Sequence, residues 1–156
     1  MEVVTRTGTE ADLEELVALY RRFCEDVAGE RGGHIYVRKE GFPEPLEAQL
    51  KAIVGDVRHL VLLGTLDNVP VGIAVGHLDE LADSSVLASV DVLYVDTPAR
   101  EVGVGEILLE AVATWAVDNG AIGLDVRVLP GMRQAKNFLE GTGFAARLLV
   151  MHRRLG

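Results

Sequence analysis

A glycine-containing turn at residues 95–105 has the residue types and spacing of an anion-binding site. Its centre reads Arg100-x-x-Gly103-x-Gly105, and Pro98 lies just before it. The first backbone N–H groups of a helix lack intrahelical partners, and glycine removes the Cβ atoms that would keep a phosphate at a distance. We therefore predict a phosphate or diphosphate site at this turn. The expected donors are the N–H groups of Val102, Gly103, Val104 and Gly105.

The turn differs from two well-known phosphate-binding loops. No Gly-Lys-Ser/Thr follows, as a nucleotide-kinase loop requires, and residues 106–108 lack the third glycine of a dinucleotide fingerprint. A tight strand–helix connection without a ligand is the alternative interpretation.

The flanking residues predict a strand before the turn and a helix after it. Residues 90–95 are almost all apolar and rich in β-branched side chains, which is typical of a strand buried on both faces. Apolar residues then recur at helical spacing from Val104 to Trp115, and Asn119-Gly120 supplies a stop. This strand–turn–helix unit is the part of the chain that must position the predicted site.

Two segments together resemble the GNAT-type N-acetyltransferases. The pyrophosphate-binding turn of that family reads Gln/Arg-x-x-Gly-x-Gly/Ala between the fourth strand and the third helix, and residues 100–105 match it. A later family segment, close to Ala-x-x-Phe-Tyr-Glu-x-x-Gly-Phe, is matched by residues 135–144 at every named position except Leu139. The resemblance covers residues 88–144 closely, and before them it rests on the order of the elements.

This resemblance implies a single α/β domain over residues 1–156 with the acyl-CoA N-acyltransferase fold, a mixed, mostly antiparallel sheet flanked by helices. It implies acetyl-CoA as co-substrate, its diphosphate held by the turn and Arg100 either adding charge or bracing the loop. Pantetheine would add to the edge of the strand at Leu93 and Val95. Leu139 replaces a tyrosine that many members are proposed to use as general acid, and Met132 replaces a cofactor-holding asparagine.

Asp91 is the candidate catalytic residue. It interrupts an otherwise apolar strand, where a carboxylate is costly unless it is paired or used. The position matches a family glutamate invoked as a base acting through water, and an acceptor amine must lose a proton before attack. The alternative is a structural carboxylate satisfied by the backbone or by Arg127. Asp125 and Arg127 share one face of the next strand by period two and could pair with each other.

Residues 28–45 are expected to form a long loop, since glycines and prolines interrupt the periodicity. In the family this region commonly shapes the acceptor site, so Tyr36 and Phe42 are the candidate substrate-binding residues. Helices are expected at 10–27, 46–54 and 134–140, and strands at 2–6, 59–66, 69–77, 121–129 and 145–154. Asp67-Asn68 should form a hairpin turn between two of these strands.

Composition narrows the class of protein. The chain of 156 residues is 49% hydrophobic and 25% charged, as in an ordinary globular domain, and its net charge of −9 argues against nucleic-acid binding. No apolar run is long enough to span a bilayer, and the four histidines lack metal-site spacing. We expect a cytoplasmic protein without a metal or a membrane partner, with a homodimer as one possible assembly.

The sequence therefore predicts an acetyl-CoA-dependent N-acetyltransferase that moves an acetyl group to a primary amine of a small molecule or peptide by direct attack on the thioester. The alternative is a degenerate relative that binds acyl-CoA as a sensor or regulatory module without turnover. A plain interaction domain comes third.

Overall fold

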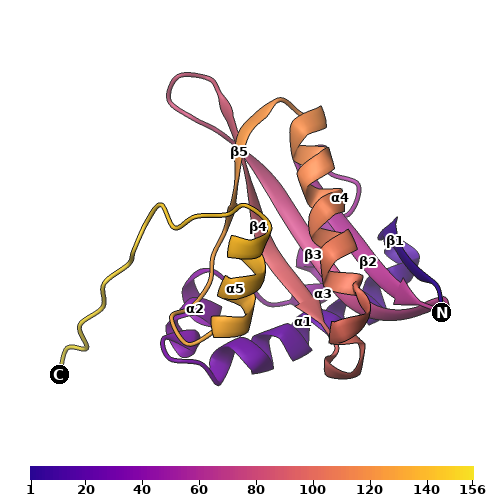
Figure 1. The fold of residues 1–156 in the computed structure, drawn as a ribbon, viewed down its shortest axis with the longest axis horizontal. Helices are drawn as coiled ribbons and strands as arrows, with labels where there is room; N and C mark the ends of the chain where they lie inside the picture. Colours follow the sequence, from indigo (N-terminus) through magenta and orange to yellow (C-terminus); the bar gives the residue numbers. More distant parts are fainter.

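One five-stranded sheet forms the centre of the computed structural model, which describes all 156 residues (Figure 1). The strands are β1 (Val3–Thr7), β2 (His59–Leu66), β3 (Val69–Glu80), β4 (Val86–Val95) and β5 (Ala121–Val126), and they lie in that order across the sheet. The first four pair antiparallel, and β5 joins β4 parallel. The predicted mixed, mostly antiparallel sheet is confirmed. Asp67 and Asn68 both have positive φ, as the expected hairpin turn requires.

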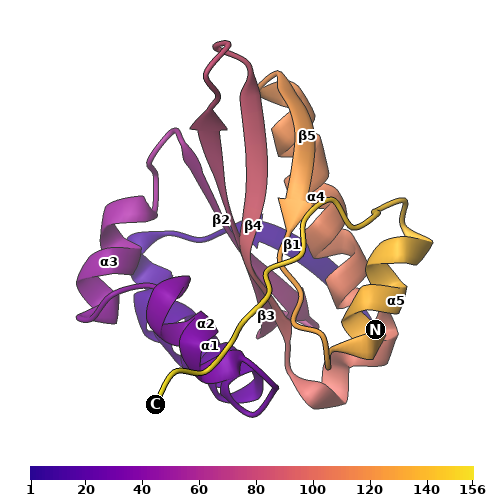
Figure 2. The same cartoon turned by 90° about the vertical axis from the view of Figure 1, so that its left-hand side faces the viewer.

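Helices cover both faces of the sheet (Figure 2). The α-helices are α1 (Leu13–Ala28), α2 (Gly33–Lys39), α3 (Leu46–Ile53), α4 (Val104–Asp118) and α5 (Arg133–Gly141), with 3₁₀ turns η1 (Glu10–Asp12) and η2 (Thr97–Val102). The α1 and α3 helices pack on one face, and α4 packs on the other. Two hydrophobic clusters result, one on each face of the sheet.

The α1 helix has an apolar stripe that faces the sheet. Its most buried members are Leu16, Leu19, Tyr20, Phe23 and Val27. Burial of such a stripe is what stabilises a helix of this length, because isolated helices are marginal in water.

The expected loop at 28–45 is partly wrong, because it contains the short helix α2. Gly32 begins α2 in the left-handed region, at φ 81°, and Arg38 and Lys39 lie in its last turn, where cations interact favourably with the helix dipole. A Cβ on Gly33 would lie 1.8 Å from the Val27 carbonyl oxygen, so glycine is required for α2 to pack against α1. In this segment the glycines lie at the beginning of a helix and do not prevent its formation.

The β4 and β5 strands part halfway along β4. Their pairing ends at Val90 and Val126, whereas β4 continues to Val95, and Figure 2 shows the two strands diverging. The β4 and β5 strands are parallel neighbours, as is typical of strands joined by a helix, but β5 ends at Val126 and not at residue 129. The end of β4, from residue 91 to residue 95, therefore has no β5 partner, and a cleft opens between the two strands.

A β-bulge places Asp91. Gly76 of β3 pairs with Val90 and Val75 pairs with Val92, so Asp91 is the extra residue. Asp91 contacts His77, on the face covered by α1, and Tyr94 packs into the cluster on that same face. Strict period two would place Tyr94 and Asp91 on opposite faces, but the bulge resets the alternation and brings both to the same face.

The strand expected at 145–154 is wrong. Residues 145–156 form no regular secondary structure and make no backbone–backbone hydrogen bond. They project away from the body of the molecule (Figure 1). An apolar pattern favours a strand only where a neighbouring strand completes the ladder, and within this chain none does.

Candidate active site

The predicted anion-binding turn is formed by η2, Gly103 and the beginning of α4. Gly103 has φ 91°, a left-handed conformation that glycine adopts without strain. No side chain caps α4, and Ile107 N–H donates to Gly103 O at 3.2 Å. The N–H groups of the residues before Ile107 in α4 are thus free of intrahelical acceptors, as an anion site requires.

The two glycines of the turn differ in the feature that makes glycine suitable at each position. Gly103 is fixed by its backbone conformation, with open space where a Cβ would stand. Gly105 has no positive φ, and a Cβ there would meet only Val95 Cγ2, at an ordinary 3.7 Å. The internal packing does not require glycine at 105. The space that Gly105 leaves open is therefore available to a ligand that approaches the helix end.

Arg100 braces the turn. Its Nε donates to the Val95 carbonyl oxygen at 2.8 Å, and its Nη2 donates to Asp26 Oδ2 on α1 at 2.6 Å. The guanidinium also lies 5.5 Å from the centre of the Tyr94 ring. Of the two roles considered for Arg100, bracing the loop is the one that these contacts support.

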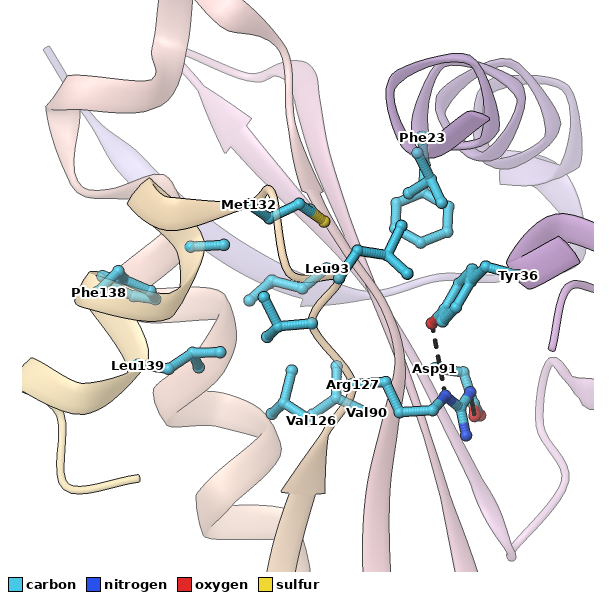
Figure 3. A pocket seen from close by; sticks show the side chains of 14 residues that line it. Phe23, Tyr36, Val90, Asp91, Leu93, Val126, Arg127, Met132, Phe138 and Leu139 are labelled. Atoms are coloured by element: carbon cyan, nitrogen blue, oxygen red, sulfur yellow. Dashed lines mark hydrogen bonds and ion pairs between the residues drawn. The ribbon is translucent and has the colours of Figure 1, made fainter. Parts of the chain in front are cut away.

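An apolar cleft of about 60 Å³, lined in part by Asp91, opens between β4 and β5 (Figure 3). On one side lie Phe23, Val27 and Tyr36 from α1 and α2, and on the other lie Met132, Phe138 and Leu139 from α5 and the residue before it. The strand residues Leu93 of β4 and Val126 of β5 form its floor, where the two strands part. Asp91 and Arg127 are the charged residues of this lining.

Asp91 is 10% exposed and lies at the centre of a chain of polar groups. One carboxylate oxygen is 2.7 Å from His77 Nδ1, and the other is 3.3 Å from Arg127 NH2. His77 Nε2 lies 3.0 Å from Asp79, whose side chain is 55% exposed. The chain Asp91–His77–Asp79 thus connects the cleft with solvent through one imidazole.

His77 is the residue that the sequence interpretation missed. The hydrogen bond to Asp91 raises the pKa of its imidazole above the ordinary 6.5, although partial burial acts in the opposite direction. A protonated imidazole can donate from both nitrogens to the two carboxylates that flank it. The hairpin register pairs His77 with Ser89, so a careful alignment of β3 and β4 around the loop at 81–85 could have suggested the contact.

The pairing considered for Asp125 and Arg127 does not form. Arg127 pairs with Asp91, and its Nε donates to the Tyr36 hydroxyl at 3.4 Å, with the guanidinium 5.8 Å from the Tyr36 ring centre (Figure 3). Asp125 instead accepts from Arg147 Nε at 2.9 Å. Asp91 and Asp125 are thus each paired with an arginine from outside their own strand. The side chains of Asp125 and Arg127 contact different neighbours and not each other.

The two candidate acceptor residues are separated. Tyr36 lies in the cleft, beside Arg127 and close to Asp91. Phe42 lines a different cavity, stacks on Tyr20 with ring centres 4.9 Å apart, and donates its N–H to the Tyr20 hydroxyl at 2.7 Å. The structure therefore brings Tyr36, but not Phe42, to the cleft that contains Asp91.

The two departures from the family pattern both lie in the cleft wall. Leu139 is 6% exposed and packs in the α4-side cluster, and Met132 lies across from Phe23 (Figure 3). Neither side chain can donate or accept a proton at this wall. Tyr94 does not line the cleft, and its burial raises the pKa of its hydroxyl.

The family is identified by sequence. The sequence model of the acetyltransferase (GNAT) family matches residues 13–144, which is most of the chain. The chain belongs to this family of acetyltransferases, whose members use acetyl-CoA. No curated protein matches the sequence. None of the helices is long and apolar enough to cross a membrane.

Solved structures share the whole fold at low identity. A transcriptional regulator from Bacillus halodurans C-125 matches at 20% identity and TM-score 0.75, over 99% of this chain and 100% of its own. An aminoglycoside acetyltransferase from an uncultured soil metagenomic sample matches at 22% and 0.74, over 99% and 95%. AAC(6')-Iy, in complex with the bisubstrate analogue CoA-S-monomethyl-acetylneamine, matches at 18% and 0.75, over 99% and 100%. These similarities support the acyl-CoA N-acyltransferase fold.

Proposed function

We propose that this protein is an acetyl-CoA-dependent N-acetyltransferase that acts on a primary amine, with Asp91 at the centre of its active site. The observation that carries the proposal is the arrangement along β4, whose end leads into the uncapped N-terminus of α4 and whose bulge places the largely buried Asp91 carboxylate in the cleft beside β5. A diphosphate fits the first feature and an amine fits the second. One strand that carries both features suits a reaction between the two ligands.

The residues at the turn fit the co-substrate. The backbone N–H groups of Val102, Gly103, Val104 and Gly105 would hold its diphosphate, and the free edge of β4 at Leu93 and Val95 would take its pantetheine arm. Acetyl-CoA supplies the activated acetyl group when bound. Binding energy from parts of the molecule remote from the thioester would position the reacting carbonyl.

Asp91 would remove the proton of the acceptor amine. An ammonium group is not a nucleophile, so the proton must leave before the nitrogen attacks the acetyl carbonyl. A neutral His77 could take up the proton from Asp91, because its Nδ1 lies 2.7 Å from the Asp91 carboxylate. The Asp91–His77 pair can then share the abstracted proton, with Asp79 on the solvent side.

The acceptor would be a small or peptidic amine that carries positive charge. Asp79 and Asp91 flank His77 beside the cleft, in a protein of net charge −9. Carboxylates on one face favour a cationic ligand. The aminoglycoside acetyltransferase among the structural neighbours makes polycationic amines a reasonable first class to test.

A regulatory module that binds acyl-CoA without turnover is the second candidate. Leu139 favours it, since many family members carry a proposed general acid at this position, and so does the structural similarity to a transcriptional regulator. In this case the turn would bind acyl-CoA, and the ligand would report on the acyl-CoA pool through a partner.

A thiol-release assay separates the candidates. The protein is incubated with acetyl-CoA and, separately, with polyamines, amino acids, aminoglycosides and peptide N-termini. We expect free thiol with at least one class of amine, and mass spectrometry should show one added acetyl group on the acceptor nitrogen. Binding of acetyl-CoA without thiol release would support the regulatory module. Activity toward hydroxyl acceptors alone would refute the amine assignment.

A further inference from the structure

Arg127 lies in the cleft with most of its hydrogen-bonding capacity unused. A guanidinium carries several N–H donors in a planar fork and keeps its charge in proteins. Nη2 of Arg127 lies 3.3 Å from Asp91 Oδ1, and Nε lies 3.4 Å from the Tyr36 hydroxyl, whereas Nη1 has no hydrogen-bond partner in the chain. Both distances exceed the roughly 2.7–2.9 Å that is usual for a hydrogen bond between a guanidinium and a carboxylate. The fork of Arg127 is therefore only loosely filled by its own protein.

The other arginines that pair with an aspartate are held more tightly. Each of the following four donates to its aspartate at 2.9 Å or less: Arg6, Arg22, Arg100 and Arg147. None of these four lines the cleft. The arginine with the loosest aspartate pair is thus the one that lines the cleft. A guanidinium in this condition is suited to bind an anionic group of a ligand through two parallel N–H donors.

Arg127 is positioned by a contact that leaves its donors free. Its guanidinium lies 5.8 Å from the centre of the Tyr36 ring (Figure 3), and such a cation–π contact holds the group through the ring face. His77 is the other possible cation beside Asp91, but its two ring nitrogens already contact Asp91 and Asp79. Arg127 is therefore the cation of this site whose donors are available to a ligand.

The spacing of Asp91 and Arg127 restricts the shape of that ligand. Asp91 would receive the proton of the acceptor amine, and Arg127 Nη2 is only 3.3 Å from the same carboxylate. An acceptor that contacts both residues must carry its anionic group directly beside its ammonium group. An α-amino acid has this arrangement, because the α-carbon alone separates its nitrogen from its carboxylate. Each charge of the acceptor would then meet the opposite charge in the protein.

The rest of the cleft indicates the side chain of the acceptor. Apart from Asp91, Arg127 and the Tyr36 hydroxyl, the residues of the lining are apolar. Figure 3 shows Tyr36, Asp91 and Arg127 on one side of the cleft and Met132 and Phe138 on the opposite side. A charged side chain would find no counter-ion on that opposite side, and burial of an unpaired charge is costly. An apolar side chain matches this wall.

We propose that the acceptor is a free α-amino acid with an apolar side chain, whose carboxylate binds Arg127 while its amine reaches Asp91. This proposal rests on the acetyl transfer proposed above and narrows its acceptor. The ammonium gives one proton to Asp91, the nitrogen bonds to the acetyl carbon, and the carbon–sulfur bond of the thioester breaks. The second proton of the nitrogen then becomes available to the departing thiolate. The products are an N-acetyl amino acid and coenzyme A.

A pair of matched acceptors tests the proposal on the unmodified protein. Thiol release from acetyl-CoA is measured with alanine, valine, leucine, methionine and phenylalanine, and with the amide of each. The amide retains the amine and the side chain but lacks the negative charge, and its amine loses a proton more readily. We expect kcat/KM to be roughly 10- to 100-fold higher for at least one acid than for its amide, as hydrogen bonds to a charged group allow.

Arg127→Gln identifies the residue that reads the carboxylate. The ratio of kcat/KM for the acid to that for its amide should fall to within about threefold of one, because the variant lacks the charge and the fork. A purely structural role of Arg127 would lower both rates and leave the ratio unchanged. Arg6→Gln is the matched control, since Arg6 also pairs with an aspartate but does not line the cleft, and it should retain the preference.

The outcomes separate this proposal from the acetyltransferase activity itself. Thiol release with polyamines or amides at rates equal to those with the free acids would overturn the amino-acid acceptor and leave the N-acetyltransferase intact. An absence of thiol release with every amine would refute the proposed activity. In that case calorimetry in the presence of coenzyme A still tests Arg127. N-acetyl-leucine should bind roughly 10-fold or more tightly than its amide, and only Arg127→Gln should remove the difference. Equal affinities in the unmodified protein would overturn the proposal.

Discussion

The proposed anion-binding turn follows β4 and the polar cluster around Asp91 includes part of it, yet the two are built in different ways. The turn consists of neighbours in sequence: the end of the strand, η2, Gly103 and the first residues of α4. The cluster takes its members from β3, β4, β5 and α2, which meet only when the sheet is formed. The turn is formed by residues that are contiguous in sequence, and its backbone tolerates little change. The cluster is a tertiary arrangement that depends on the register of the strands.

This difference separates two kinds of mutational effect. Substitutions in the turn should change binding of the co-substrate and leave the chemistry of the amine intact. Substitutions in the cluster should change the chemical step and leave binding of the co-substrate intact. The predictions below examine this separation.

The largest effect is expected for Asp91→Asn. Asparagine retains the shape but not the basicity of the carboxylate, so kcat should fall by roughly 10²–10⁴ if Asp91 acts as a base. The Kd for acetyl-CoA, measured by calorimetry, should change less than about threefold, since Asp91 is remote from the turn. An unfolded variant would instead indicate a structural carboxylate that is needed to satisfy His77 and Arg127.

The next effect concerns the space left by Gly105. Acetyl-CoA at a hundredfold excess over its Kd should stabilise the native protein by roughly 2.7 kcal/mol. Gly105→Val should abolish most of this stabilisation, because the new side chain occupies the approach to the helix N-terminus. The fold itself should survive, since a Cβ at 105 meets no close neighbour.

Gly141→Val is the matched control. Gly141 also lies in a helix, also has open space around its Cβ position, and is outside the turn. Thermal shift with and without coenzyme A should show the ligand effect in the control and not in Gly105→Val. If millimolar coenzyme A does not change the melting temperature of the unmodified protein, this result would contradict the proposed co-substrate site altogether.

The sequence was sufficient to predict the turn, whose residues are contiguous, and insufficient to predict the cluster around Asp91, whose residues meet only in the folded protein. Residues 100–105 predicted the turn because a helix N-terminus and its glycines are encoded by contiguous residues. The bulge at Asp91 was not predicted, because an extra residue in one strand becomes visible only against the register of the other. The contact with His77 and the orientation of Tyr94 follow from that bulge.

Two segments were misjudged because their structure depends on neighbours. The glycines at 32 and 33 were read as loop residues, although they permit α2 to begin and to pack closely against α1. The apolar run at 148–151 was read as a strand, although no strand in its own chain pairs with it. Sequence periodicity indicates which secondary structure a segment can form. Whether the segment forms it depends on the neighbouring elements that pack against it or pair with it.

A smaller effect is expected from the tyrosines near the cleft. Because Leu139 offers no acid and a thiolate with a pKa of about 8.5 can leave without full protonation, kcat should rise with pH to a plateau as the amine or base deprotonates. Tyr36→Phe and Tyr94→Phe should change kcat by less than about tenfold, against the 10²–10⁴ that an essential acid contributes. A bell-shaped profile that loses its alkaline limb in either variant would identify that tyrosine as the acid.

The smallest effect is the dependence of stability on His77. Its pKa is raised in the folded protein by the hydrogen bond to Asp91, so the folded state binds the proton more tightly than the unfolded state. The resulting stabilisation is fully present below the unfolded pKa of about 6.5 and is lost as the pH rises through the folded pKa. The free energy of unfolding of the unmodified protein should therefore exceed that of His77→Gln by more at pH 5.5 than at pH 9, as measured by urea denaturation.

Two measurements distinguish this linkage from a general effect of losing a histidine. His34 is exposed and forms no ion pair, so His34→Gln is the matched control for the loss of a histidine. The imidazole resonances of His77, followed by NMR, should titrate above 6.5 in the unmodified protein and at lower pH in Asp91→Asn, because the carboxylate that favours the imidazolium is gone. An unchanged His77 titration in Asp91→Asn would mean that the two side chains are not coupled in solution, and the shared-proton role assigned to the pair would fail with it.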